Sequence, residues 1–334
     1  MCTLPQKVIL LEERVSRDLN HDSTLTDKLC EGVVKYLSIK KLQEIYSETG
    51  NETAFEGLKS IFSIFYDLKE VRNSISRIRL NELLGRRNIQ IGNNNVRESL
   101  NNALHELALT DADNEYNGRG RTWCVHLVFA SKVLHTFNND LPIVDSFVKG
   151  FFNLDYDRYN GATQFIDRCN HVSNCYDGLI GYYDRMEEYD LDLLADLFSQ
   201  IMNNRLAFDA EEHIGNYANT QNSIFDSIRA DNNLLNTVVE YAGNIETINN
   251  DITTVKKIDF MIWNYWRTIY KRINAPDLPG DVALIQGERQ DVINAFEQMR
   301  GQNLVSAVDI RNKSSAKSYV RKHSEKFYKI FWVI

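Results

Sequence analysis

The chain has 334 residues, of which 43% are hydrophobic and 25% charged, and its formal net charge is −8 at pH 7. This composition is typical of a globular protein with room for a large core. The negative charge excludes indiscriminate coating of nucleic acid, because such proteins are basic, but it permits DNA binding through a local basic face. No run approaches the roughly 20 apolar residues of a membrane helix. The start of the chain lacks the pattern of a signal peptide and the five cysteines form no CxxC pair, so we expect a cytoplasmic protein with no membrane partner.

Apolar residues recur at spacings of three and four along most of the chain, which predicts helices. The clearest segments are 25–45, 55–68, 96–109, 191–202, 224–241 and 282–299. Only 4 prolines occur, as expected for long helices that proline would interrupt. No pair of alternating segments joined by a hairpin dipeptide stands out. We therefore predict an all-α fold.

Three regions are predicted. Residues 1–115 form an N-terminal helical lobe, residues 116–275 a core rich in aromatic and unusual polar residues, and residues 276–334 a basic helical extension. Basic side chains gather in this extension and in a second cluster, both interpreted as solvated helix faces. The clusters are Lys313, Lys317, Arg321, Lys322, Lys326 and Lys329, and Arg72, Arg77, Arg79, Arg86 and Arg87.

The segment 130–148 carries most of the functional argument. Lys132 lies in a run that is apolar on nearly all sides from Trp123 to Phe137, so we expect it to be buried. Burial disfavours the ammonium form, which predicts a lowered pKa for Lys132 and a fraction of neutral, nucleophilic amine. The ordinary alternative is a lysine whose amine reaches solvent along its apolar stem.

An aspartate follows after a turn. Asn138-Asn-Asp140 turns the chain and Pro142 fixes an extended approach, which places Asp145 where a helix N-cap would lie. Plain capping would explain Asp145 taken singly, and the free backbone N–H groups there would keep it ionised. Two short helices joined by a turn would bring Lys132 and Asp145 across a common cleft. A nucleophilic amine beside a fixed carboxylate is the pair needed to break an N-glycosidic bond and trap the sugar.

At this point the sequence shows a family resemblance. Ser131-Lys132-Val-Leu-His135, followed by Leu141-Pro142-Ile-Val-Asp145-Ser146, resembles the lysine-to-aspartate segment of the 8-oxoguanine DNA glycosylase-like branch of the helix-hairpin-helix glycosylases. Lys257-Ile-Asp259-Phe-Met-Ile-Trp263 is similar to the last core helix of bacterial members. The resemblance covers residues 117–270 and implies a two-lobed helical DNA glycosylase-like fold. It also implies that Lys132 attacks the sugar C1′ to form a Schiff base while Asp145 stabilises positive charge on the sugar.

The chain departs from the family in two places. The glycine-rich hairpin that grips a DNA phosphate is absent, and Asn117-Gly118-Arg119-Gly120 is the nearest glycine-bearing turn. No cysteine quartet for an iron–sulfur cluster is present, so no cofactor is expected. DNA anchoring must therefore differ from that of the family.

The resemblance implies base flipping and excision, with strand cleavage as a further step where Lys132 captures C1′. Some relatives of divergent layout defend bacteria against phages by removing bases such as glucosylated hydroxymethylcytosine, and the polar segment 156–183 would suit a sugar. Repair of 8-oxoguanine is the alternative substrate, and no obligate protein partner is expected. Substrate contacts are predicted from Trp123, His135, Phe152, Tyr156, Tyr159, Asn174, Asp177 and Trp263. DNA contacts are predicted from Arg119, Arg121, Lys149 and Lys271.

Three other functions stay open. Arg121-Thr-Trp-Cys-Val-His126 fits the Arg-x4-His spacing of metal-independent all-α ribonucleases of the HEPN class. Cys169-Asn-His171-Val-Ser-Asn-Cys175 offers three zinc ligands, although no second cluster completes the site and we expect no metal. A helical binding or scaffold protein would use Lys132 and Asp145 only as a buried ion pair.

Overall fold

The computed structural model describes residues 3–21, 23–66, 74–87, 91–92, 94–107, 126–154, 165–204 and 225–274. All regular structure in these ranges is helical, which confirms the all-α prediction. None of the described helices is long and apolar enough to cross a membrane. The helices are α1 (Leu4–His21), α2 (Ser23–Thr49), α3 (Glu52–Phe65), α4 (Ser74–Leu84), α5 (Val96–Leu107), α7 (Leu127–Phe137), α8 (Ser146–Phe152), α9 (Phe165–Asp184), the 3₁₀ turn η2 (Glu187–Tyr189), α10 (Asp192–Asn204), α12 (Asn232–Gly243), α13 (Ile245–Asp251) and α14 (Thr254–Asn274).

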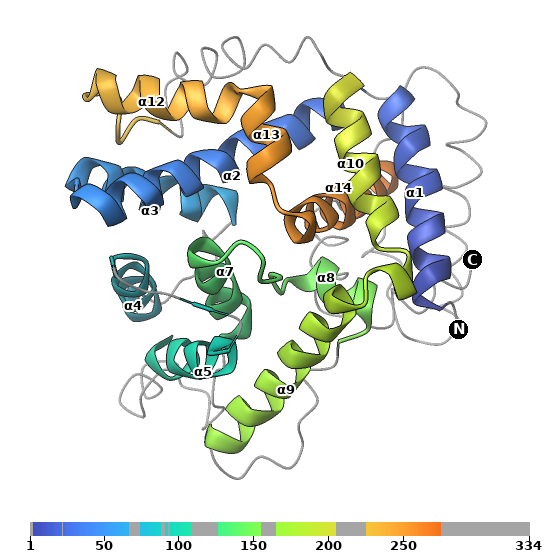
Figure 1. Cartoon of the computed structure of the whole chain (residues 1–334), viewed down its shortest axis with the longest axis horizontal. Coiled ribbons are helices and arrows are strands. Elements are labelled where there is room, and N and C mark those ends of the chain that lie inside the picture. Colours follow the sequence, from blue (N-terminus) through green and yellow to red (C-terminus); the bar gives the residue numbers. More distant parts are fainter. Residues whose placement is uncertain are drawn as a thin grey trace.

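Two long helices organise the packing. Helix α2 contacts α3, α12, α7 and α14, while α14 also contacts α1, α8 and α10. Figure 1 shows α3 and α12 beside α2 on one side of the molecule, α1 and α10 on the other, and α5, α7 and α9 below them. Buried side chains from Val8 in α1 to Tyr265 in α14 form one continuous core. The predicted regions 1–115 and 116–275 therefore share a core, and their boundary lies outside the described residues.

The predicted helices overlap those of the structure, with α3 ending at Phe65 before the predicted end at 68 and one start clearly different. Periodicity placed a helix over 224–241, but residues 225–230 form turns and α12 begins only at Asn232. Asp231 sets this start, because its side chain accepts a hydrogen bond from the Leu234 N–H at 3.0 Å. The predicted helix 282–299 lies outside the described residues.

A glycine and an asparagine set the break between α2 and α3. Gly50 has φ +69°, a left-handed conformation that glycine adopts without strain. Asn51 then caps α3, since its side chain accepts the Ala54 N–H at 3.1 Å. This turn reverses the chain so that α3 packs back along α2 and ends at Phe65, directly before the half-buried Tyr66.

Candidate functional site

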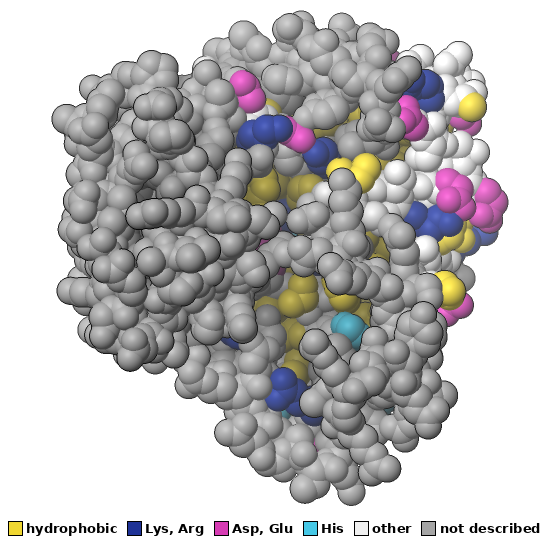
Figure 2. All heavy atoms as spheres, turned by 180° about the vertical axis from the view of Figure 1, so that it is seen from behind, with side chains coloured by type: hydrophobic (Ala, Val, Ile, Leu, Met, Phe, Trp, Pro, Cys, Tyr) yellow, Lys and Arg dark blue, Asp and Glu magenta, His cyan; other side chains and the backbone are white. Residues whose placement is uncertain are grey.

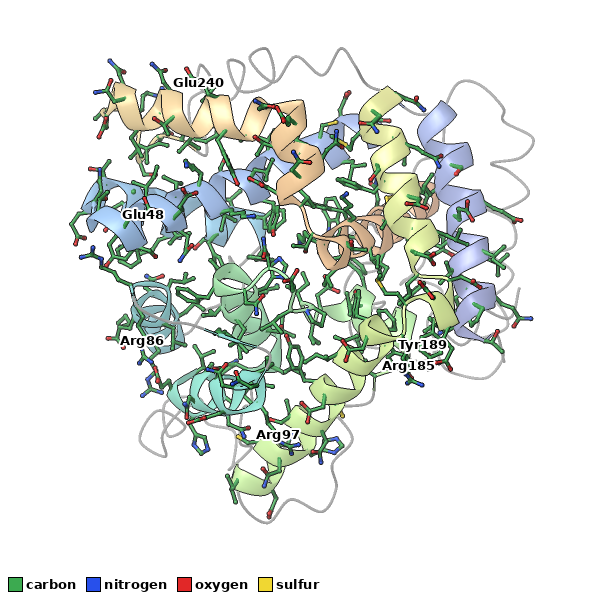
Figure 3. The ribbon with its side chains drawn as sticks, viewed as in Figure 1. Glu48, Arg86, Arg97, Arg185, Tyr189 and Glu240 are labelled. Atoms are coloured by element: carbon green, nitrogen blue, oxygen red, sulfur yellow. The ribbon has the colours of Figure 1, made fainter. Side chains whose placement is uncertain are left out.

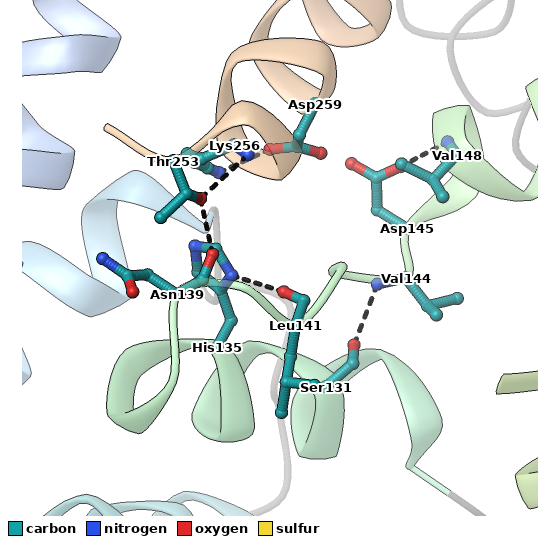
Figure 4. A network of polar contacts seen from close by, with 10 residues as sticks. All are labelled: Ser131, His135, Asn139, Leu141, Val144, Asp145, Val148, Thr253, Lys256 and Asp259. Carbon is teal, nitrogen blue, oxygen red and sulfur yellow. Dashed lines mark hydrogen bonds and ion pairs between the residues drawn. The ribbon is translucent and has the colours of Figure 1, made fainter. Parts of the chain in front are cut away.

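The connection between α7 and α8, residues 138–145, is irregular and yet held on several sides. Ser131 and His135 of α7 hold it from below, because the Ser131 hydroxyl accepts the Val144 N–H at 2.9 Å and His135 Nδ1 lies 2.6 Å from the Leu141 carbonyl oxygen. The hydroxyl of Tyr176 in α9 donates to the Pro142 carbonyl at 2.7 Å, and that of Thr253 donates to the Asn139 carbonyl at 2.7 Å. Buried polar backbone needs such partners, and here they fix the place where Asp145 stands (Figure 4).

Asp145 is the N-cap residue of α8, as predicted. Its Oδ1 accepts the backbone N–H groups of Phe147 and Val148, each at 2.8 Å. The side chain is half-buried, and its other oxygen faces the carboxyl group of Asp259 on α14 (Figure 4). The carboxylate therefore has a fixed orientation before any ligand binds.

Lys132 is buried in α7, which confirms that part of the sequence prediction. Its side chain is 6% exposed, and Nζ lies 4.8 Å from the ring centroid of Tyr66. Tyr66 directly follows α3, so a residue far away in the sequence forms the surface against which the amine rests. An ammonium over an aromatic face is stabilised by the ring quadrupole.

A second lysine and aspartate enter the site from α14. Lys256 and Asp259 stand one helical turn apart, 1% and 5% exposed, and form an ion pair through Lys256 Nζ and Asp259 Oδ2. Rings surround the ammonium of Lys256, with centroids at 5.1 Å for Tyr36, 5.2 Å for Phe65 and 4.8 Å for Phe260. We call Lys132, Asp145, Lys256 and Asp259 the charged cluster.

The pKa of Asp259 depends on the charges of all three other members of the charged cluster. Burial raises the pKa of its carboxyl group and the negative charge of Asp145 adds to the effect, while the positive charges of Lys256 and Lys132 oppose it. Lys132 and Asp145 thus act on the same carboxyl group from opposite ends of the α7–α8 connection. The structure therefore brings the two predicted residues together around a third residue, Asp259, to which the sequence assigned no role.

Two tyrosines border the two carboxyl groups. The pKa of Tyr66 and that of Tyr183 in α9 are raised well above their usual value, first by burial and then by the nearby charges of Asp259 and Asp145. Both hydroxyl groups therefore keep their protons at neutral pH. They supply neutral hydrogen-bond donors beside two carboxyl groups.

His135 lies in the interior, and its hydrogen bond to the Leu141 carbonyl supports the α7–α8 connection. It is 1% exposed, and burial together with the positive charge of Lys256 lowers its pKa to about 3. The ring is therefore neutral at pH 7, and its Nδ1–H donates to Leu141. Its Nε2 has no hydrogen-bond partner among the described residues. The predicted substrate contact is thus a support of the α7–α8 connection in this structure.

Two further predicted substrate contacts fill core positions. Phe152 is 4% exposed and packs on Phe151, Tyr182 and Tyr183, with ring centroids 5.0, 5.2 and 5.4 Å away. Trp263 is half-buried against α2, where a Cβ atom added to Gly32 would meet its Cζ3 at 3.9 Å. Both rings contribute to helix packing around the site.

Asn174 and Asp177 are not brought to the charged cluster. Arg97 of α5 donates to Asn174 Oδ1 at 2.6 Å and to Asp177 Oδ2 at 2.8 Å, in an exposed contact between α5 and α9 (Figure 3). Sequence pattern could not separate this contact from a sugar pocket, because the partner arginine lies in another helix. In this structure the two residues link α5 to α9, and their contact with a substrate stays a prediction.

The possible zinc ligands do not converge either. Cys175 Sγ and His171 Nε2 are 3.9 Å apart on one face of α9, whereas Cys169 is fully buried in the core. Burial raises the pKa of the Cys169 thiol to about 11, which disfavours the thiolate that zinc needs. No group of three potential ligands occurs in the described part of the chain.

Several predicted residues lie outside the described residues. These are Trp123, Tyr156 and Tyr159 for the substrate, and Arg119 and Arg121 for DNA. Lys271 belongs to α14, where only its backbone is described, and Lys149 is half-buried on α8. His126 is the N-cap residue of α7, so the Arg121–His126 pair of the ribonuclease interpretation is described at one end only.

Most of the described arginines form hydrogen bonds or ion pairs within the chain. Arg86 pairs with Glu106, and Arg87 donates to the carbonyl groups of Ser47 and Glu48 at 3.3 Å. These two members of the predicted solvated cluster therefore tie α4 to its neighbours. On the face shown in Figure 2, many Lys and Arg side chains of the described residues lie beside Asp or Glu side chains.

Comparison with family models, curated proteins and solved structures finds no match to this chain. The functional assignment therefore depends on the charged cluster. Sequence reasoning missed Lys256, Tyr66 and Tyr183 as members of this site. One feature of the sequence could have indicated Lys256. It lies with Asp259 directly before the apolar run Phe260-Met-Ile262, in an otherwise amphipathic segment.

Proposed function

We propose that this protein is a DNA glycosylase that flips a modified base out of DNA and excises it, leaving an abasic site. The observation that carries the proposal is that the buried Lys132 and the half-buried, N-capping Asp145 both act on the buried carboxyl group of Asp259. A lysine and a fixed carboxylate at one dry place are the groups that glycosidic bond cleavage with sugar capture requires. The sequence resemblance supports the same chemistry.

Asp145 has the role of stabilising the sugar cation. Breaking the C1′–N bond sends its electron pair to the base and leaves positive charge on the sugar. Because two backbone N–H groups fix Asp145 Oδ1, the carboxylate needs little reorganisation when this charge develops. A fixed charge in a water-excluded site is worth more than the same charge in water.

Lys132 has the role of the nucleophile. Its amine, once deprotonated, attacks C1′ and forms the N–C1′ bond; the C1′–O4′ bond then breaks, a proton passes from the nitrogen to O4′, and a Schiff base results. Elimination from this intermediate would cut the strand, so lyase activity accompanies the proposed base excision. The buried position of Lys132 keeps competing water away from the intermediate.

The proposed substrate is a hypermodified cytosine such as α-glucosyl-hydroxymethylcytosine, in defence against phages, and 8-oxoguanine is the second candidate. This order comes from the divergent layout of the sequence. An enlarged base and an oxidised base differ in size and in hydrogen-bonding groups, so one assay with both separates them. Flipping costs a few kcal/mol and is easiest for bases that pair poorly.

The cost of the cluster argues against a purely structural role. Each buried ion loses hydration worth several kcal/mol, and well-packed apolar residues often stabilise a fold at least as well. Groups with perturbed pKa values beside a specific charged partner are enriched at functional sites. A scaffold protein would gain little from two buried lysines and a buried aspartate gathered beside Asp145.

The test incubates the purified chain with phage DNA containing glucosylated hydroxymethylcytosine, with an 8-oxoguanine duplex and with unmodified DNA. Abasic sites are then counted with an aldehyde-reactive probe. We expect abasic sites on one modified substrate, and a rate lowered by about 10²–10³ in Asp145→Asn. Borohydride should trap a protein–DNA adduct with the wild type and none with Lys132→Ala.

Arg229→Gln is the matched control, because it removes an exposed charge in the turns before α12 and should leave excision unchanged. Abasic sites that persist in Asp145→Asn would assign the activity to another site. Absence of abasic sites on every DNA, together with RNA cleavage that needs Arg121 and His126, would replace the glycosylase by the ribonuclease.

A further inference from the structure

Asp259 has an unusual environment for a structural carboxylate. Its Oδ2 is paired with Lys256, but its Oδ1 is buried and has no hydrogen-bond partner among the described residues. Buried polar atoms normally have partners, and an unpaired one marks a place where a ligand or water completes the site. Asp259 is 5% exposed and faces Asp145 (Figure 4).

The charges of the cluster are unbalanced once the amine is ready to react. With Lys132 neutral and both carboxyl groups ionised, the cluster would contain two carboxylates and the single ammonium of Lys256. The net charge is then −1, from two negative charges and one positive charge. Positive charge on a bound sugar would neutralise it.

Lys256 is held as a permanent counter-ion on the α14 side. The rings of Tyr36, Phe65 and Phe260 enclose its ammonium at 4.8–5.2 Å from their centroids, an arrangement that stabilises a cation. Its pairing with Oδ2 orients Asp259 so that Oδ1 is left for another partner. Lys256 is therefore suited to hold Asp259 in place.

We infer that Asp259 is a second anionic residue of the site, which acts with Asp145 on the positive charge of the sugar while the base leaves. This inference rests on the proposed function. The C1′–N bond breaks with its electron pair going to the base, and two carboxylates then stabilise the sugar cation. Lys256 is a positioning residue that acts through Asp259.

A pH dependence follows from the two carboxylates. Burial and the facing negative charge of Asp145 raise the pKa of Asp259, and a bound cation would favour loss of its proton. The other groups around them are Lys132 and His135 from α7, Tyr66 after α3, Tyr183 from α9, Tyr36 from α2 and Lys256. Burial keeps His135 and these tyrosines uncharged at neutral pH. Affinity for a cation should therefore rise with pH as Asp259 loses its proton.

The test uses duplexes that differ at one sugar. One carries a pyrrolidine abasic-site analogue, which is cationic at neutral pH, and the other carries the neutral tetrahydrofuran analogue. The ratio of the two dissociation constants measures the preference for positive charge and does not require the base to be known. We expect the wild type to prefer the cation, and Asp259→Asn to lose about tenfold of this preference.

Two further variants sharpen the test. Lys256→Gln removes the positive charge that opposes the raised pKa of Asp259 and orients its Oδ2, so the preference for the cation should fall at neutral pH and recover at higher pH. If Asp259→Asn does not fold, the pair Lys256→Met/Asp259→Leu replaces it, since it leaves no orphan charge. The same loss of cation preference is expected from this pair.

The outcomes separate the two proposals. A wild type without preference for the cationic analogue overturns the proposed function itself. A preference that Asp145→Asn abolishes, but that a folded Asp259 variant retains with an unchanged pH profile, overturns only the role of Asp259. Loss of preference in both single variants, with circular dichroism unchanged, supports both proposals.

Discussion

The neutral state of buried His135 makes folding sensitive to acid. In the unfolded chain its pKa returns to the ordinary value of 6.5, whereas in the folded chain it is about 3. Below about pH 6.5 the imidazole of His135 is therefore protonated in the unfolded chain but not in the folded one. The free energy of unfolding falls as pH falls through this range, until about pH 3. His135→Asn keeps a donor for the Leu141 carbonyl but cannot be protonated. It should remove the contribution of His135 to the slope of unfolding free energy against pH, which is up to about 1.4 kcal/mol per pH unit.

Urea unfolding at several pH values measures this component as the difference in slope between wild type and variant. His105→Asn is the control, because His105 is exposed on α5 and its replacement should leave the slope of the wild type. An equal slope in His135→Asn and the wild type would mean that the ring is protonated in the folded state.

The Lys256–Asp259 pair predicts strong coupling between two substitutions. Lys256→Met leaves a carboxylate in the interior without its main partner and should lower the unfolding free energy by about 3–5 kcal/mol. Adding Asp259→Leu should recover most of this loss, because the orphan charge disappears. Chemical denaturation of both single variants and the double variant measures the coupling, and additive losses would contradict a buried ion pair.

The residues predicted from sequence are those whose environment is local. Lys132 was predicted to be buried because its own helix is apolar on all sides, and Asp145 was predicted as a cap because a turn precedes it. Tyr66 and Lys256 complete the site from α3 and α14, and their approach depends on how whole helices pack. No spacing within the segment 130–148 carries that information.

At the scale of elements, a glycine decides how closely α3 approaches its neighbours. A Cβ atom added to Gly57 would stand 2.5 Å from Ile228 Cγ2 and 3.2 Å from Leu42 Cδ1. Ile228 is branched and fully buried, so its side chain cannot move aside without an energetic cost. Gly57→Ala should lower the unfolding free energy by about 1–3 kcal/mol through overpacking, although alanine is the better helix former.

Gly178 of α9 offers the matched control. Nothing lies within 4 Å of a Cβ atom added there, so Gly178→Ala should raise the unfolding free energy by about 0.5–1 kcal/mol. Opposite signs for the two substitutions in thermal or urea unfolding would confirm close packing at Gly57. A stabilising Gly57→Ala would show that α3 can move away from α2.

Helix positions followed from periodicity because one face of each amphipathic helix is buried. Periodicity failed at residues 225–230, where Phe225 and Ile228 are buried from a series of turns. Apolar residues three apart occur in successive turns as well as in helices, so their spacing did not show where α12 begins. The N-cap residue Asp231 marks that start. For a related reason the sequence did not predict the partner of Asn174 and Asp177, because Arg97 reaches them from another helix.

At the scale of the whole molecule, single contacts join segments that are distant in sequence around the site. The buried Lys7 of α1 donates to the Phe151 carbonyl of α8 at 2.8 Å, and Lys40 of α2 donates to the Asp251 carbonyl of α13 at 2.9 Å. The core that surrounds the charged cluster runs from α1 to α14. The orientation of the cluster is therefore a property of the whole described fold.

A shared core predicts that the regions 1–115 and 116–275 unfold together. Hydrogen exchange followed by mass spectrometry at increasing urea should show peptides of α3 and α14 losing protection at the same concentration, because each helix packs on α2. Gly57→Ala should shift both midpoints downward by the same amount, although only α3 carries the substitution. Gly178→Ala is the control and should shift both upward. Loss of protection in α3 at lower urea, with α14 still protected, would contradict the shared core and show two lobes that unfold separately.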